Sequence, residues 1–144
     1  MNIIEMNADH VVQIAELEKI CFSDPWSENS IASELTNKLA LWLVAEVDGR
    51  VAGYIGSQTV PDESDMMNVA VHPDFRRRGI AEALVNALCD ALKKQGSVSL
   101  TLEVRASNDP AKALYEKLGF LQVGKRPNYY RNPKEDALIL KKML

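Results

Sequence analysis

The feature that most constrains the fold is one continuous stretch, residues 66–81, with the sequence MMNVAVHPDFRRRGIA. Its apolar beginning predicts a strand, His72-Pro73 a turn, and the residues after Gly79 the start of a long helix. The first backbone N–H groups of a helix lack intrahelical acceptors and point, with the positive end of the helix dipole, at whatever lies in front of them. Gly79 and Ala81 let an anion approach the backbone, and Arg76 to Arg78 add positive charge. The stretch therefore predicts a diphosphate site between a strand and a helix.

The better-known phosphate loops of nucleotide enzymes do not occur in the chain. Neither G-x-x-x-x-G-K-S/T nor G-x-G-x-x-G is present, which argues against a nucleoside triphosphatase and against a dinucleotide enzyme. The simpler alternative is an ordinary helix start that happens to be basic. Arg-Arg-Arg-Gly alone would favour that alternative, whereas the preceding strand favours an anion site.

Length and composition fit one domain over residues 1–144, because 47% of the residues are hydrophobic, enough for one core. The formal net charge of −3 argues against a nucleic-acid partner and favours basic substrates. The chain has neither a cationic start followed by an apolar run nor 18 consecutive apolar residues, so we expect no membrane partner and a cytoplasmic location. Cys21 and Cys89 lie in apolar helical patterns, so we expect two core cysteines, no disulfide framework and no metal site.

Short turn signals separate strand and helix patterns along the chain, which predicts a single α/β (α+β) unit. Before the anion loop we expect first a strand at Ile3-Ile4 and a helix that is capped by Asn7 or Asp9 and ends near Phe22. A short helix follows from Ser27 to Thr36-Asn37, with Ile31 and Leu35 on one face. Then come a hairpin of strands 41–47 and 50–60 around the turn Asp48-Gly49, and a polar loop over 61–65.

After the anion loop, a helix over about 78–95 has apolar residues four apart, so one face packs on a sheet. Residues 98–104 alternate, with Val98, Leu100, Leu102 and Val104 opposite Ser99, Thr101 and Glu103, which predicts a strand with two unlike faces. Asn108-Asp109-Pro110 begins another helix that Gly119 ends. The expected final strands are 120–123 and 137–140, separated by a connection over 126–134.

The anion loop matches the Q/R-x-x-G-x-G/A pattern of the GCN5-related N-acetyltransferases at Arg76, Gly79 and Ala81. Residues 113–120, ALYEKLGF, resemble a further segment of that family, and the order of elements resembles the family's order. The resemblance covers essentially the whole chain and is most specific over residues 66–120. It implies a central mixed sheet of six to seven strands flanked by about four helices, with acetyl-coenzyme A as cosubstrate and no metal.

Three shorter segments, Pro25-Trp26-Ser27, 102–108 and Asn128-Tyr129-Tyr130, resemble the bacterial family members that acetylate the N-terminal alanine of a small-subunit ribosomal protein. The resemblance implies a protein N-terminal peptide, from a ribosomal protein, as substrate. The alternatives are a broader N-acetyltransferase acting on lysines, polyamines or other small amines, and a non-catalytic module that binds acetyl-coenzyme A. The presence of both Glu103 and Tyr115 argues against the non-catalytic module.

Acyl transfer to an amine needs a base for the ammonium and stabilisation of the thiolate that leaves. The resemblance implies Glu103 as the base, acting directly or through a water, and Tyr115 as the acid. From the residues alone, the alternative for Glu103 is a solvated strand residue, and Tyr115 fits a core residue on the apolar face of its helix equally well. An α-amino group titrates near 7.7 to 8.0 and a lysine side chain near 10.4, so one carboxylate deprotonates an N-terminus more readily.

The remaining site residues follow the family pattern. Those implied to bind the coenzyme, through backbone groups or the anion loop, are Val69, Ala70, Val71, Arg76, Arg77, Arg78, Gly79, Ile80, Ala81 and Asn108. Asn108 fits a helix cap equally well. Trp26, Tyr129 and Tyr130 are expected at the substrate groove, with interior packing as the alternative.

Three further sets of residues have simpler interpretations. His72 is expected to be a turn residue rather than a base, and Lys125, Arg126 and Arg131 a solvated basic stretch. Asp24, Glu28, Asp62, Glu63 and Asp65 are expected near the groove, where they would attract a cationic peptide, or as solubilising loop charges.

Overall fold

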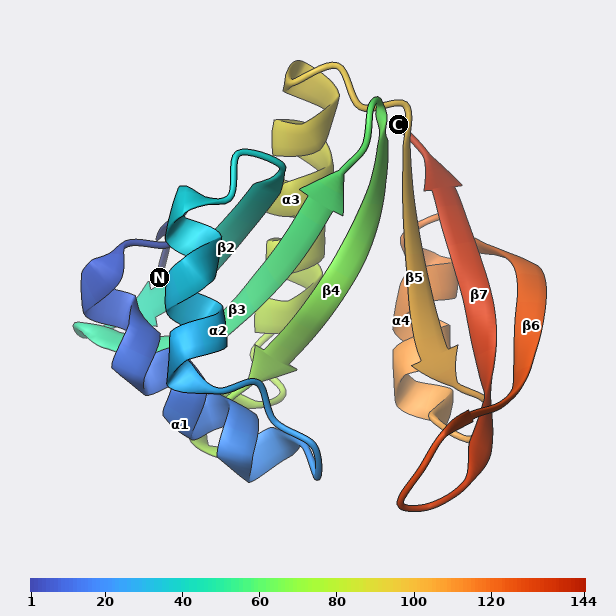
Figure 1. Cartoon of the computed structure of the whole chain (residues 1–144), viewed down its shortest axis with the longest axis horizontal. Coiled ribbons are helices and arrows are strands. Elements are labelled where there is room, and N and C mark those ends of the chain that lie inside the picture. Colours follow the sequence, from blue (N-terminus) through green and yellow to red (C-terminus); the bar gives the residue numbers. More distant parts are fainter.

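The computed structural model describes all 144 residues, which surround one seven-stranded mixed sheet of order β1-β2-β3-β4-β5-β7-β6 (Figure 1). The strands are β1 (Asn2–Glu5), β2 (Ala40–Val47), β3 (Arg50–Thr59), β4 (Glu63–Val71), β5 (Ser99–Arg105), β6 (Leu121–Tyr130) and β7 (Glu135–Met143). The helices are α1 (Val11–Cys21), α2 (Glu28–Ser33), α3 (Ile80–Lys94) and α4 (Asp109–Lys117), with 3-10 turns at Ala8–His10, Glu34–Thr36 and Pro73–Phe75. The expected mixed sheet with about four helices is confirmed.

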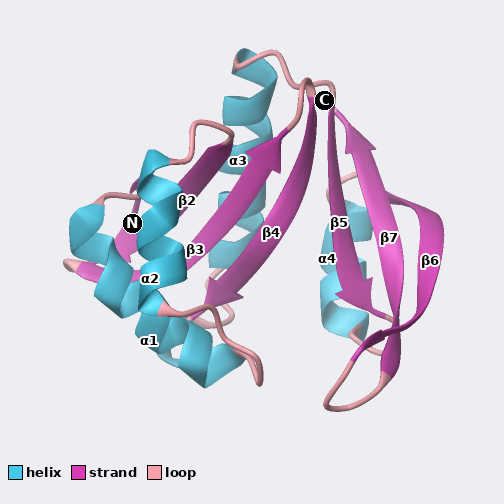
Figure 2. Cartoon of the chain, in the orientation of Figure 1, coloured by secondary structure: helices cyan, strands magenta, loops and turns pink.

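The helices cover the two faces of the sheet unequally (Figure 2). Helices α1 and α2 lie on one face, in front of β1 to β4, and α3 and α4 lie on the other. One hydrophobic cluster joins α3 and α4 to the strands, and a second joins α1 and α2 to β2 and β3. As a result β5, β7 and β6 have a helix behind them and none in front.

The burial of each strand follows from this coverage. Strands β2 and β3 are buried continuously, over 41–45 and 51–57, because helices cover both of their faces. Strand β5 alternates instead, with Leu100, Leu102 and Val104 buried under the helices. Glu103 therefore lies on the uncovered face, as the alternation predicts.

The sheet divides between β4 and β5, its only parallel pair. Their ladder runs from Glu63↔Ser99 to Asp65↔Thr101, beyond which the strands separate in a V (Figure 1). A register shift between Gly56 and Ser57 of β3 marks a bulge in β4 beside this separation. From Met66 onward, the edge of β4 that faces β5 therefore has no neighbouring strand.

Two expected loops are strands in the structure. Glu63 to Asp65 were expected in a polar loop, but they begin β4 because they pair with β5 more than thirty residues away. The connection expected over 126–134 is shorter, since β6 continues to Tyr130. Pro127 and Asn128 resemble loop punctuation, yet they form an irregularity inside the hairpin, where the Asp136 carboxylate accepts a hydrogen bond from the Asn128 N–H (2.7 Å).

Three smaller expectations are also wrong. Val98 precedes β5 and is exposed, and Leu35 lies in a 3-10 turn with its side chain partly in solvent. Cys89 is buried as expected, whereas Cys21 is only half-buried at the end of α1. No helix is long and apolar enough to cross a membrane, and no three His, Cys, Asp or Glu side chains gather where they could hold a metal ion.

Candidate active site

The loop before α3 presents a row of free backbone donors. Gly79 caps the helix with φ 73°, in the left-handed region that favours glycine, and a Cβ there would meet no atom within 4 Å. The first helical hydrogen bond runs from the Ala83 N–H to the Gly79 carbonyl (3.0 Å), and the N–H groups of residues 77–82 have no acceptor in the chain. These donors and the helix dipole can hold a diphosphate, as the sequence predicts.

Two of the three arginines in this loop have guanidinium groups that point to different places. The Arg76 guanidinium turns back toward β4 and α1, where it donates to the Val71 carbonyl (3.4 Å) and lies 3.8 Å from the Cys21 thiol. Arg78 stacks on the ring of Phe75 at 5.1 Å. Arg77 adopts φ 63°. The positive charge is therefore spread around the loop rather than concentrated at one point.

Strand β4 offers an unpaired edge next to this loop. On its other side Val69, Ala70 and Val71 pair with Ile55, Tyr54 and Gly53 of β3. Toward β5 their backbone has no partner strand, because the two strands have separated. An extended ligand can add to this edge as another strand would.

Tyr115 of α4 reaches the point where the strands separate. Its hydroxyl lies 3.9 Å from the sulfur of Met66, the first residue of β4 beyond the parallel ladder. The ring is 6% exposed and makes an edge contact with Phe120 (centroids 5.5 Å apart). Burial raises the pKa of Tyr115 to about 12. Tyr115 is thus a core residue whose hydroxyl faces the separation.

Glu103 lies on the other side of this separation, two residues beyond Thr101, the last β5 residue in the ladder. Its side chain is 28% exposed, and Oε1 is 3.3 Å from Nε of Arg126. Arg126 is exposed, as expected of a solvated basic stretch, and its charge also pairs with this carboxylate. Because neighbouring residues of β6 face opposite ways, Lys125 pairs instead with Asp136 (3.1 Å).

Two tyrosines at the end of β6 adjoin Glu103. The interaction with Glu103 is the largest cause that raises the pKa of Tyr129, and burial followed by the Glu103 charge raises the pKa of Tyr130 to about 12. The two rings make an edge contact (centroids 5.1 Å apart). They place two hydroxyl groups on the uncovered face beside the carboxylate.

Arg105, which sequence reasoning missed, fixes the hairpin that carries these tyrosines. Its guanidinium donates to the carbonyls of Pro133 (2.9 Å) and Arg131 (3.1 Å) and stacks on the Tyr130 ring (4.3 Å). The signal available in the sequence was only its position two residues after Glu103, on the same face of β5.

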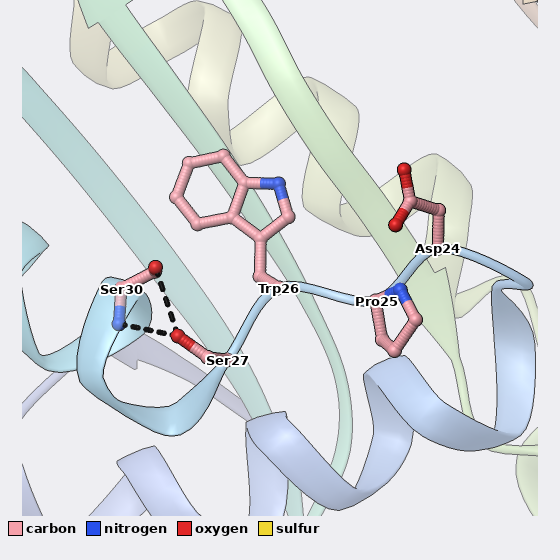
Figure 3. A pocket seen from close by; sticks show the side chains of 5 residues that line it. All are labelled: Asp24, Pro25, Trp26, Ser27 and Ser30. Carbon is pink, nitrogen blue, oxygen red and sulfur yellow. Dashed lines mark hydrogen bonds between the residues drawn. The ribbon is translucent and has the colours of Figure 1, made fainter.

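The α1–α2 loop supplies the opposite wall of the site. A hollow of about 510 Å³ lies against it, and Figure 3 shows the five residues that line it: Asp24, Pro25, Trp26, Ser27 and Ser30. Asp24 and Trp26 extend to the same side of the loop, and the Ser27 hydroxyl accepts the Ser30 N–H (3.1 Å) to start α2. This loop and the β6–β7 hairpin both lie at the end of the sheet where β4 and β5 have separated (Figure 1).

Comparison with known proteins decides the family. The model of the acetyltransferase (GNAT) family matches residues 11–120, which include the anion loop, Glu103 and Tyr115. The chain belongs to the GNAT family. It is an N-acetyltransferase with acetyl-coenzyme A as cosubstrate, as the sequence predicts.

Several relatives that are similar over most of the chain share one name. The chain is 40% identical over 126 residues to the ribosomal protein bS18-alanine N-acetyltransferase of Escherichia coli (strain K12), covering 86% of this chain and 84% of that protein. It is 42% identical over 127 residues to the Salmonella typhimurium protein of the same name, covering 87% and 85%. The crystal structure of the ribosomal-protein-S18-alanine N-acetyltransferase from Escherichia coli superposes with a TM-score of 0.91, at 37% identity over 99% of this chain and 92% of that one.

The structure also places the other residues that the sequence singled out. Asn108 caps α4, where its Oδ1 accepts the Ala111 N–H (3.2 Å). His72 is a turn residue whose Nδ1 accepts the Asp74 N–H (3.1 Å). Among the acidic residues expected near the groove, Asp24 lines the hollow, whereas Glu63 lies in the parallel ladder at the closed end. Asp65 ends that ladder, where partial burial and then the Glu103 charge raise its pKa.

Glu18 is the second residue that sequence reasoning did not single out. It is 1% exposed, on the inner face of α1, and accepts hydrogen bonds from the Trp26 N–H, the Tyr54 hydroxyl and the Asn68 amide. Burial raises its pKa, and the hydrogen bonds from Trp26 and Asn68 oppose that rise. The available signal was a carboxylate on the apolar stripe formed by Ile14, Leu17 and Cys21.

Proposed function

We propose that this enzyme acetylates the α-amino group of the N-terminal alanine of ribosomal protein bS18, in the cytoplasm. Relatives of that name at 40% and 42% identity, which match over most of both chains, support the choice of substrate. The resemblance of Pro25-Trp26-Ser27 and Asn128-Tyr129-Tyr130 to the same branch also supports it.

One observation carries the chemical part of the proposal: Glu103 and the Tyr115 hydroxyl flank the separation between β4 and β5. Glu103 lies two residues beyond the ladder on β5, and Tyr115 contacts the first unpaired residue of β4. A reacting carbonyl held on the β4 edge would therefore have a carboxylate on one side and a hydroxyl on the other.

The chain fits acetyl-coenzyme A in two ways. The free N–H groups of residues 77–82 would hold the pyrophosphate, with Arg77, Arg78 and Ile80 around it. The unpaired edge at Val69, Ala70 and Val71 would bond the extended arm and polarise the carbonyl, and Asn108 keeps its amide N–H₂ free for a further contact. When bound, acetyl-coenzyme A supplies the acetyl group as a thioester.

Glu103 would act as the general base. It is open enough for an amine or one water to reach it, and the nearby Tyr129 and Arg126 restrict its position. Deprotonating an α-ammonium rather than a lysine ammonium saves about 2.5 pKa units, or roughly 3.4 kcal/mol. A single carboxylate is therefore better matched to an N-terminus.

Tyr115 would stabilise the leaving thiolate by donating a hydrogen bond. Its pKa of about 12 lies roughly 3.5 units above that of an ordinary thiol, so full transfer of the proton to a free thiolate is uphill by roughly 5 kcal/mol. Burial thus favours a hydrogen-bond donor over a proton donor.

The peptide would lie between the α1–α2 loop and the β6–β7 hairpin. Trp26 on one wall and Tyr129 and Tyr130 on the other offer flat, partly polar surfaces for a backbone and its first side chains. Asp24 adds negative charge to the first wall, which suits a basic peptide.

The test is acetylation of matched peptides, read by tandem mass spectrometry. One peptide has a free N-terminal alanine followed by arginine, and the other has the same sequence with a blocked N-terminus and one free lysine. The free alanine peptide should react faster by on the order of a hundred-fold at pH 7, from the difference in amine pKa alone.

Two outcomes would contradict the proposal. Acetyl groups found mainly on lysine side chains would favour a broader N-acetyltransferase. Tight binding of acetyl-coenzyme A with no transfer to any amine would favour a non-catalytic binding module.

A further inference from the structure

Glu18 is a carboxylate without a cation, buried between the peptide wall and the strand that would hold the cofactor. None of the ion pairs in the structure includes it, although it is 1% exposed. A carboxylate withdrawn from water is stabilised only by donors directed at its oxygens. The structure provides three such donors, one each from the α1–α2 loop, β3 and β4.

Each donor connects a different part of the site. The Trp26 N–H, 2.8 Å from Oε1, belongs to the loop that lines the hollow. The Asn68 amide, 3.0 Å from Oε2 and 3.3 Å from Oε1, comes from the residue immediately before Val69. The Tyr54 hydroxyl bonds Oε2 from β3, the strand beneath both. One carboxylate thus connects the peptide loop to the cofactor edge.

The loop has few other attachments at this point. The backbone N–H of Asp24 has no acceptor in the chain, and the Ser27 to Ser30 contacts are internal to the start of α2. The Trp26 side chain packs on Trp42 by an edge contact (centroids 5.4 Å apart), which is apolar and leaves the backbone N–H to other partners. The Glu18 bond is therefore the directional contact that fixes the backbone of Trp26.

We propose that Glu18 is a positioning residue for peptide binding: its carboxylate fixes the α1–α2 loop relative to β4, so that the peptide's amine meets the acetyl group. The proposal rests on the proposed function, since it concerns the peptide wall of that site. Glu18 itself touches neither substrate. Its loss should therefore weaken peptide use while leaving cofactor binding intact.

The experiment compares Glu18→Leu, which keeps the bulk but removes both acceptors, with Glu16→Leu on the exposed side of the same helix. Glu18→Leu should raise the peptide KM by about tenfold or more, the effect of a lost charge-assisted hydrogen bond, with the acetyl-coenzyme A KM unchanged. Glu16→Leu should leave both constants unchanged. Tyr54→Phe removes a donor but keeps the Trp26 bond, so its peptide KM should stay close to wild type.

Hydrogen exchange of the wild-type enzyme tests the same contact without a variant that could fail to fold. The Trp26 amide should exchange more slowly than the Asp24 amide in the same loop, and saturating peptide should slow it further. Equal exchange at the two amides, an unchanged peptide KM in Glu18→Leu, or an equal rise in Tyr54→Phe would each overturn the positioning role. If the wild-type enzyme acetylates no peptide, the proposed function itself has failed, and the exchange measurement still reports on the contact.

Discussion

The half of the sheet formed by β1 to β4 is covered by helices on both faces, whereas the half formed by β5, β7 and β6 is covered on one. Each half holds an important carboxylate. Glu18, in the covered half, is 1% exposed and has three donors and no cation. Glu103, in the half that helices cover on one face only, is 28% exposed and lies beside Arg126. The same chemical group thus holds backbone in one environment and stays accessible from solvent in the other.

The largest expected effect tests the covered half through stability. Leu88 of α3 is completely buried, so Leu88→Ala should lower the free energy of unfolding by about 2 to 5 kcal/mol. Leu121 of β6 is 72% exposed, so Leu121→Ala should change the free energy of unfolding by less than about 0.5 kcal/mol. Urea denaturation measures both, and a comparable loss in the two variants would remove the distinction between the halves.

A somewhat smaller effect is expected on catalysis at the uncovered face. Glu103→Gln keeps the shape and removes the basic oxygen, so turnover should fall by about a hundred-fold, with little change in acetyl-coenzyme A affinity or stability. Glu116→Gln, on the exposed side of α4, is the matched control. Steady-state rates from pH 6 to 9 check this, and near-normal rates for Glu103→Gln would exclude it as the base.

The smallest effect concerns the cation beside Glu103. Arg126→Gln removes a positive charge from the face where a basic peptide would bind, so the peptide KM should fall by about two- to fivefold at low salt, and less at high salt. Lys125→Gln removes the same charge from the opposite face of β6, where it pairs with Asp136, and should change the KM less. Equal effects of the two variants would show that only net charge matters.

Short sequence patterns correctly predicted the turns, helix caps and strand faces, which depend only on neighbouring residues. The Asp48-Gly49 turn has the two positive φ angles that the hairpin needs, and Asn7 and Asn108 cap helices through their side chains as expected. The alternation over residues 98–104 correctly placed Glu103 opposite the core, although Val98 itself precedes the strand. These features need only a few neighbouring residues, so a single sequence contains them.

The errors arose where distant segments decide the structure. Glu63 to Asp65 form a strand because of the partner they meet, and β6 passes through Asn128 because Asp136 stabilises its backbone from the next strand. Glu18 was not singled out, since its three donors come from segments 8, 36 and 50 residues away. Its role depends on contacts that no helical pattern contains.

The short parallel ladder between β4 and β5 also means that these two strands pair only at the end of the sheet far from the proposed substrate site. Three residue pairs join the two strands there, and the Ser64 and Ser97 hydroxyl groups, 2.7 Å apart, support the joint. Beyond Asp65, β4 continues to Val71 for about 20 Å without pairing with β5, so a rotation of about 3° at the joint would displace its far end by about 1 Å. Since a displacement of about 1 Å between reacting groups can cost on the order of a hundred-fold in rate, the closed end of the ladder has to hold the two strands to within a few degrees for groups at the open end to meet.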